Sequence, residues 1–311
     1  MTTVKGENRY SFLATDTETE ELVEINKNGE VVWKIDTALT VFDLWHLGED
    51  RILFCHYGRG GSGARIIDRK GNILFQYTTE NEIFSCQPLD NGGVLVGELR
   101  QKRLVETDDK GNISKIIPFD YRGADPHETM RSARKLPNGT YMIVSPGSNK
   151  IFFLDESGNI LREFDTRPNT FGAVVRPNGN VVYSCMDGLA ELDASGNEVW
   201  TLLEKDVPEI NIRWLLGIHI RKNGNIVCNN WLGHGHNGEG VPVFEVTPDK
   251  KIVWQCDCRE RLPNLGNFYL LGDGDDEEIA KTPRREVFGQ QRTYTQSRSA
   301  GIFPRIGFVK K

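Results

Sequence analysis

A repeated β-hairpin pattern limits the folds open to this chain more than any other feature. In each copy, two short apolar segments rich in β-branched residues flank a turn, which is typical of paired strands. Five copies carry a turn glycine at intervals of roughly 40 residues: Gly29, Gly71, Gly111, Gly158 and Gly196. A sixth copy, Val243 to Trp254, lacks the glycine. The chain is therefore predicted to be a repeat protein.

A second hairpin signal lies between these copies. Asn-Gly pairs end at Gly139, Gly179 and Gly224, and weaker versions occur near Gly48 and Gly93. Asn-Gly between apolar runs favours type I′ turns, which need positive φ at both central residues. Each repeat therefore holds four short strands. This period predicts an all-β fold, a six-bladed β-propeller of four-stranded blades, in preference to a β-sandwich or an open solenoid.

The ring is expected to close through its two ends. Complete blades are predicted at 41–79, 83–120, 129–166, 169–204 and 213–257. The N-terminal unit, about 9–36, lacks an inner strand, which Asn267 to Leu271 is predicted to supply. Pairing of the N- and C-terminal segments would remove exposed sheet edges. The propeller domain is thus expected over residues 1–272, followed by a charged tail, 273–311, that is extended or disordered.

Composition narrows the class of protein. Apolar residues make up 38% of the chain, and no stretch approaches the roughly 18 apolar residues of a membrane span. The net charge of −6 argues against nucleic-acid binding, which leaves a basic footprint. Met1 to Tyr10 lacks the basic and apolar regions of a signal peptide, so a cytoplasmic location is expected, or a secreted or periplasmic one if a leader had been removed. We expect a monomer.

The six cysteines lie in or beside apolar, strand-like runs such as Ile52 to Cys55. We interpret them as buried free thiols, which behave as small apolar side chains.

The hairpin topology sorts the loops onto two faces of the ring. Tight turns occupy one face, and longer connections rich in His, Arg and Gly occupy the other. Propellers usually bind ligands at such loops, because rigid strands position them. Four of the six histidines belong to this second face: His56, His127, His234 and His236.

Alignment of the predicted inner strands adds further candidates. One column is small or polar, as a crowded channel requires: Asp43, Ser85, Ser132, Gly172 and Gly217. A neighbouring column contains Phe42, Phe84 and Phe171, which are expected to pack between blades. Arg131 replaces the aromatic residue of this column in the fourth blade. Its charge predicts either a polar pocket or an ion pair at that position.

These side chains receive chemical roles as hypotheses. Imidazoles titrate near neutrality, so the acid–base candidates are His127, His219, His234 and His236. The ligand-binding candidates are of two kinds: basic side chains, which pair with anions, and aromatic rings, which stack on sugars. They are His56, Arg100, Arg131, Arg134, Trp214 and Trp231. A zinc site is a minor alternative, with His234, His236 and either His219 or Cys228 as ligands. No cofactor is expected. Gly58 to Gly63 is no phosphate loop, because it lacks the lysine and lies between strands.

The repeat resembles a known group of propellers. Asp193 to Trp200 is similar to the tryptophan-docking repeat of quinoprotein-like (PQQ-like) propellers, which the segments ending at Trp33 and Trp254 match in part. The Arg134 to Gly139 run resembles arylsulfotransferase-like propellers, which are six-bladed. This likeness covers about residues 9–271 and implies the fold and a structural role for the docking tryptophans. It does not extend to PQQ, because the metal and disulfide site of the quinoprotein dehydrogenases has no match here.

Two functions remain open from the sequence. The first is a His- and Arg-lined pocket at the mouth of the central channel that binds an anionic or polyhydroxylated, carbohydrate-related small molecule. Such a protein would process its ligand by acid–base chemistry, as a lyase, a hydrolase or an arylsulfotransferase-like transferase. The second is a non-catalytic scaffold for protein interactions. Convergence of the His and Arg side chains on one cavity favours the pocket, whereas an exposed apolar patch favours the scaffold.

Overall fold

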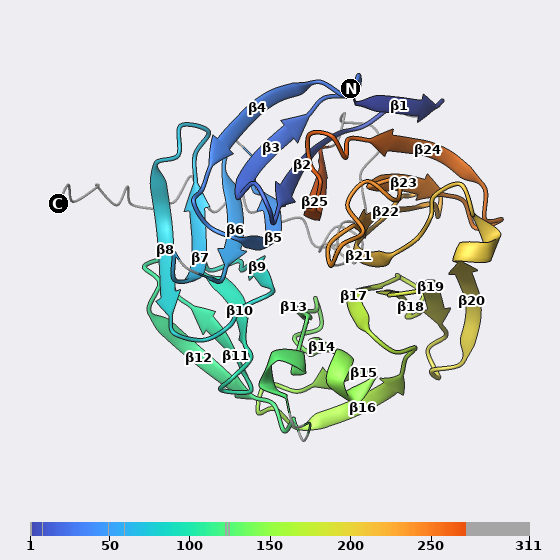
Figure 1. The fold of residues 1–311 in the computed structure, drawn as a ribbon. Helices are drawn as coiled ribbons and strands as arrows, with labels where there is room; N and C mark the ends of the chain where they lie inside the picture. Colours follow the sequence, from blue (N-terminus) through green and yellow to red (C-terminus); the bar gives the residue numbers. More distant parts are fainter. Residues whose placement is uncertain are drawn as a thin grey trace.

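The computed structural model describes residues 2–271 except 8, 49, 59, 122 and 124. These residues form six antiparallel sheets arranged as the blades of a ring, so the predicted six-bladed β-propeller is confirmed (Figure 1). In blades two to six the strands follow one another in chain order from the inner to the outer edge. Three short 3-10 helices lie in the loops, namely η1 Pro126–Glu128, η2 Pro146–Ser148 and η3 Glu204–Asp206.

The strand bounds agree with the predicted blades. The strands of blades two to four are β5 Val41–His46, β6 Ile52–His56, β7 Ser62–Ile67, β8 Ile73–Thr79, β9 Cys86–Pro88, β10 Val94–Glu98, β11 Arg103–Thr107, β12 Ile113–Pro118, β13 Ser132–Lys135, β14 Tyr141–Ser145, β15 Lys150–Leu154 and β16 Ile160–Asp165. Those of blades five and six are β17 Thr170–Val175, β18 Val181–Cys185, β19 Gly188–Leu192, β20 Glu198–Leu203, β21 Trp214–Ile220, β22 Ile226–Trp231, β23 Val243–Val246 and β24 Ile252–Asp257.

Blade one is built from both ends of the chain. Its inner strand is β25 Leu265–Leu271, which pairs with β2 Ser11–Asp16 and is followed outward by β3 Glu21–Ile25 and β4 Val31–Asp36. Leu13 lies opposite Tyr269 in this pairing. Figure 1 shows the orange-red β25 beside the dark blue β2. The predicted closure of the ring is therefore confirmed.

One strand was not predicted. β1 Thr3–Gly6 pairs with β24 and makes blade six a five-stranded sheet. Its residues are mostly exposed, so no apolar alternation marks it in the sequence. Gly6 has φ of 105°, and a Cβ there would lie 2.1 Å from the carbonyl oxygen of Val253, so only glycine fits this close approach.

Tryptophans on outer strands connect neighbouring blades. Trp33 on β4 donates a hydrogen bond of 2.9 Å to the carbonyl of Arg69 in blade two. Trp200 on β20 does the same, at 2.8 Å, to Pro248 in blade six. Trp254 is 1% exposed and packs edge-on against Tyr10 of blade one. These contacts agree with the structural role expected for the docking tryptophans.

The remaining sequence predictions about the fold can be compared directly. All six cysteines are buried and free, which confirms their interpretation as core thiols. Among the residues that the structure describes, no helix is long and apolar enough to cross a membrane. The predicted charged tail, 273–311, lies outside the described residues.

Candidate functional site

β-Bulges shape the entrance to the centre of the ring. In β5, Phe42 is the extra residue between the paired positions Val41 and Asp43. Similar irregularities fall between Thr170 and Ala173 in β17 and at the corresponding positions of β21 and β25. A bulge bends the strand and redirects a side chain. Phe42, Phe84 and Phe171 line a pocket on the ring axis. They also pack between blades, as expected, because Phe42 contacts Phe84 and Phe171 contacts Trp214 of the next blade.

Hydrogen bonds from second strands hold these bulges in place. The hydroxyl of Ser184 accepts a bond of 3.0 Å from the Gly172 N–H of its own blade and donates one of 2.6 Å to the carbonyl of Leu216 in blade six. In blade six, the side-chain oxygen of Asn229 accepts a hydrogen bond from the Gly217 N–H. The side-chain NH2 of Asn229 donates a bond of 3.1 Å to the carbonyl of Leu265 in blade one. These bonds tie β17 to β21 and β21 to β25.

The resulting cavity, which we call the mouth pocket, has a volume of about 540 Å³ and receives residues from all six blades. This volume lies within the range typical of small-molecule sites. Its principal lining residues are Thr17, Phe42, Asp43, Tyr57, Phe84, His127, Glu128, Arg131, Asn169, Phe171, Trp214, Leu216, Trp231, His234 and Asn267.

Aromatic rings form two clusters within the mouth pocket. The first cluster consists of Phe171, Trp214, Trp231 and His234, with ring centroids 4.9–6.3 Å apart in edge-to-face pairs. The second cluster consists of Phe42, Tyr57, Phe84 and His127, with Phe84 at its centre and centroid distances of 4.6–6.2 Å. Mutual edge-to-face packing fixes the rings in place.

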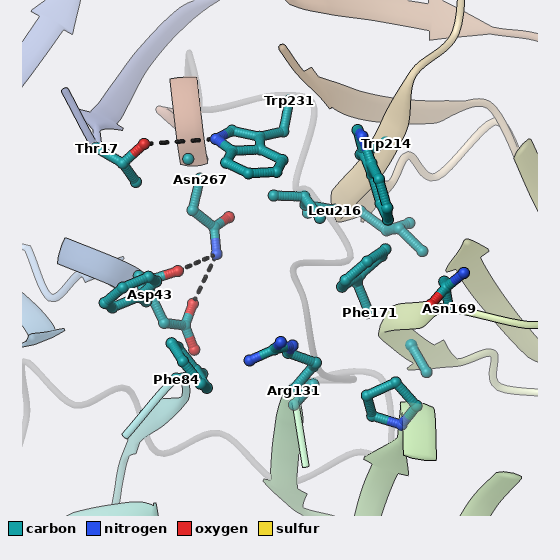
Figure 2. Close-up of a pocket in the computed structure, with 18 of the residues that line it drawn as sticks. Thr17, Asp43, Phe84, Arg131, Asn169, Phe171, Trp214, Leu216, Trp231 and Asn267 are labelled. Carbon is teal, nitrogen blue, oxygen red and sulfur yellow. Dashed lines mark hydrogen bonds between the residues drawn. The ribbon is translucent and has the colours of Figure 1, made fainter. Parts of the chain in front are cut away.

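Arg131 brings a positive charge into this aromatic setting. Its guanidinium carbon lies 4.4 Å from the centroid of the Phe84 ring, and the side chain is half-buried. No hydrogen bond and no ion pair connects it to another described residue, and Figure 2 shows it reaching into the pocket between Phe84 and Phe171. Burial lowers the pKa of Arg131, while the charges of Glu128, Glu82 and other carboxylates act in the opposite direction.

The floor of the pocket is a polar network around Asp43, which is 2% exposed. One carboxylate oxygen accepts bonds from an Arg134 guanidinium N–H at 2.9 Å and from the Cys86 backbone N–H at 3.2 Å. The other accepts from the side-chain amide of Asn267 at 3.2 Å, as Figure 2 shows. Arg134 is itself 5% exposed and lies over the Trp45 ring. The floor therefore balances its own charge.

A histidine–carboxylate pair lies at the rim. His127 Nδ1 is 3.3 Å from a carboxylate oxygen of Glu82, a buried residue. The same carboxylate raises the pKa of Tyr57, through a hydrogen bond first and burial second. With Nδ1 engaged by Glu82, Nε2 is the imidazole nitrogen left for a ligand in the pocket. An imidazole oriented by a carboxylate is the usual arrangement for general acid–base catalysis.

The structure brings together six of the ten residues selected from the sequence. The residues that line the mouth pocket are His127, Arg131, Arg134, Trp214, Trp231 and His234. The other four lie elsewhere. His219 is fully buried, with Nε2 3.2 Å from the carbonyl oxygen of Phe268. His236 and Arg100 form ion pairs with Glu239 and Glu82, respectively.

His56 is the fourth residue outside the pocket. It is 3% exposed, and its Nδ1 lies 3.2 Å from the carbonyl oxygen of Gly61. Burial, together with the nearby positive charge of Arg65, lowers the pKa of His56 from 6.5 to about 4. No group of three or more His, Cys, Asp or Glu side chains within the described part of the chain could hold a metal ion.

The buried imidazole of His56 predicts a pH-dependent stability. Between pH 6.5 and 4 the unfolded chain binds a proton that the folded protein refuses, so stability decreases as the pH falls. The loss expected from His56 over this interval is about 3 kcal/mol. His56→Gln should flatten the dependence by that amount in urea unfolding measured at each half pH unit. An NMR titration that places the pKa of His56 near 6.5 would contradict the prediction.

The sequence analysis missed Glu82 and the lining role of the inner aromatic column. Glu82 lies 45 residues from His127 along the chain, and no local motif connects the two. The aromatic column carried a usable signal, because Arg131 places a charge in a column whose other members are uncharged.

Comparisons with known proteins extend only to the fold. No protein-family model matches the sequence, and no curated protein matches it. A solved protein of unknown function from Bacteroides caccae is similar over 86% of this chain and 100% of its own, with a TM-score of 0.75 and 19% identity.

Two further similar structures are lyases. Virginiamycin B lyase from Staphylococcus aureus, solved as a catalytically inactive histidine-to-alanine variant with quinupristin, is 13% identical and covers 83% of this chain and 99% of its own, with a TM-score of 0.55. A streptogramin B lyase is 13% identical over 82% of this chain and 87% of its own, with a TM-score of 0.57. These likenesses support the β-propeller. The more specific resemblance to quinoprotein-like and arylsulfotransferase-like propellers remains a resemblance of repeat motifs.

Proposed function

We propose that the mouth pocket binds a small anionic molecule, and that Arg131 pairs with its charged group. The observation that carries this proposal is that the Arg131 side chain is half-buried, yet its guanidinium has no hydrogen bond or ion pair with any described residue. A cation removed from water is costly unless it is paired. A guanidinium also presents parallel N–H donors that match carboxylate, sulfate or phosphate oxygens.

The other charges around the pocket are already balanced. Asp43 pairs with Arg134 in the floor, and Glu82 contacts His127 and Arg100 at the rim. Glu128 lines the pocket but is exposed, so water screens its charge. Within the described residues, Arg131 is thus the half-buried charge on the pocket wall that has no direct ion pair, although nearby carboxylates act on it through space.

The distribution of exposed apolar residues favours a pocket over a scaffold. The large apolar side chains on the surface lie mostly on the outer strands of different blades, so they are spread around the ring: Val31, Val32, Ile113, Ile116, Ile160, Leu161, Met186 and Val199. The selected site residues show the opposite pattern, because four of the histidines and arginines and both tryptophans converge on one cavity.

Acid–base processing of the bound ligand is the second role that we propose, with His127 as the proton-transfer group. Its contact with Glu82 supports this role. So does the virginiamycin B lyase of similar fold, for which the histidine-to-alanine variant is catalytically inactive. The binding proposal does not depend on this step.

Thermal unfolding with a panel of small carboxylates, sulfates and phosphates tests the binding proposal. An anion that binds the folded protein should raise the midpoint by about 2–4 °C at ten times its Kd, relative to sodium chloride of equal ionic strength. Arg131→Gln should abolish that rise. Arg162→Gln is the matched control, because Arg162 also lies over a phenylalanine, at 4.0 Å from the Phe153 ring, but on the outer strand β16. A rise that persists in Arg131→Gln would disprove the assignment.

A further inference from the structure

We infer that the ligand of the mouth pocket is an aromatic monocarboxylic acid and not a sugar acid. The inference rests on the proposed function, because it assumes that Arg131 holds an anion. It goes further by assigning the uncharged part of the ligand. This assignment uses the two aromatic clusters and the nearby polar side chains that already have hydrogen-bond partners in the protein.

The two aromatic clusters leave room for a flat apolar ring next to the cation. Phe84 and Phe171 flank Arg131 on its two sides, and Trp214 and Trp231 line the pocket opposite it (Figure 2). A ligand whose carboxylate meets Arg131 therefore places its body among these rings. Aromatic rings prefer offset or edge-to-face contact with one another, and the rings of both clusters contact each other in this way. An aromatic ligand could make the same kind of contact with them.

Three polar side chains that line the pocket, Asp43, Asn267 and Thr17, are already engaged by protein partners. Asp43 accepts from Arg134 and Asn267, and the remaining oxygen of the Asn267 amide accepts from the Phe268 N–H at 2.9 Å. The hydroxyl of Thr17 likewise accepts from Trp231 Nε1 at 3.4 Å and donates to a backbone carbonyl. A sugar ring would bring several hydroxyls here without partners, and each unpaired hydroxyl lowers affinity about tenfold.

The charge balance favours a monoanion. Arg131 supplies one positive charge, and Glu128, an acidic side chain on the pocket wall whose charge acts on Arg131, would repel a second negative charge on the ligand. One guanidinium paired in bidentate fashion with one carboxylate satisfies both groups.

Isothermal titration calorimetry with three probes tests the inference: 2-naphthoate, neutral 2-naphthamide and D-glucuronate. We expect 2-naphthoate to bind at least tenfold more tightly than either other probe. Arg131→Gln should weaken 2-naphthoate at least tenfold and leave 2-naphthamide unchanged. Trp214→Leu should weaken 2-naphthoate at least threefold and leave D-glucuronate unchanged. Arg162→Gln is again the control, and thermal unfolding verifies that each variant is folded.

The outcomes separate the two proposals. If D-glucuronate binds as tightly as 2-naphthoate, and Arg131→Gln weakens both, the aromatic assignment is wrong and the anion site stands. If neither anion binds the natural protein, or if Arg131→Gln leaves the binding of both unchanged, the proposed function itself is wrong. If Trp214→Leu weakens neither probe, the aromatic cluster is not the contact surface and the inference fails.

Discussion

A chain that ends at Asn264 should lose the cooperative unfolding transition of the propeller, whereas a chain that ends at Leu271 should keep it. The two truncated chains differ only by β25. This strand supplies the fully buried Phe268 and Leu270 and covers Phe12 on β2. Burial of one large apolar side chain contributes about 1.5–3 kcal/mol. The strand carries four buried side chains, Leu265, Phe268, Tyr269 and Leu270. Their loss, with all the ladder hydrogen bonds of the strand, approaches the roughly 5–15 kcal/mol that stabilises a typical folded protein.

Circular dichroism and intrinsic tryptophan fluorescence, followed through a urea titration, measure this difference. The open ring of the shorter chain would expose the edge of β2, and exposed edges favour aggregation. An increase in sedimentation coefficient should therefore accompany the loss of the transition. If both chains unfold with the same midpoint and slope, the closure of the ring by β25 contributes nothing to stability, and the prediction is wrong.

Asp43→Asn should destabilise the protein by about 3–5 kcal/mol, because it leaves the buried Arg134 guanidinium without its counter-charge. The two groups are 2.9 Å apart, and both side chains are almost fully buried. Asparagine keeps the shape of the side chain and can keep the hydrogen bond from Asn267, but its NH2 group then replaces the oxygen that accepts from Arg134 and Cys86, so the change removes the counter-charge together with one acceptor. The same change should leave the secondary structure intact at low temperature, since the strands around the floor retain their ladders.

A double-mutant cycle with Arg134→Met tests the origin of this effect. If the cost comes from an uncompensated charge, the double variant should be more stable than Asp43→Asn alone, because neither charge is then present. Chemical unfolding at pH 7 gives the four free energies. Strict additivity of the two single changes would show that Asp43 and Arg134 act independently, contrary to the geometry of the floor.

Much of the architecture could be predicted because it is encoded by local residues. At the outer hairpins, Asp193 accepts hydrogen bonds from the backbone N–H groups of Ser195 and Asn197, and Gly196 takes the positive φ of 89° that the turn requires. Such turns need only four or five consecutive residues, so they appear in the sequence as a motif. The alternation of apolar residues between them then specifies the strands.

The candidate site was predictable only in part. The face of the ring could be found, because loop positions follow from strand order, and Arg131 could be selected because it interrupts an apolar column. The contact between Glu82 and His127 could not be predicted, since it joins residues from two different blades. His56 and His219 appeared equivalent to His127 in the sequence, although both are buried among strands.

The sequence by itself determined the number of blades, the strands of each blade except β1, and the strand that closes the ring. These features depend on turn residues and on the alternation of apolar and polar residues along each strand. Both signals involve residues that are close together in the sequence. Only the tertiary structure decided which side chains face the ring axis. That choice depends on the bulges in the inner strands, which are held by Ser184 and Asn229 through hydrogen bonds to the next blade. A bulge shifts its side chain by one position out of alternation, so the direction of Phe171 or Leu216 cannot be known until the neighbouring blade is in place.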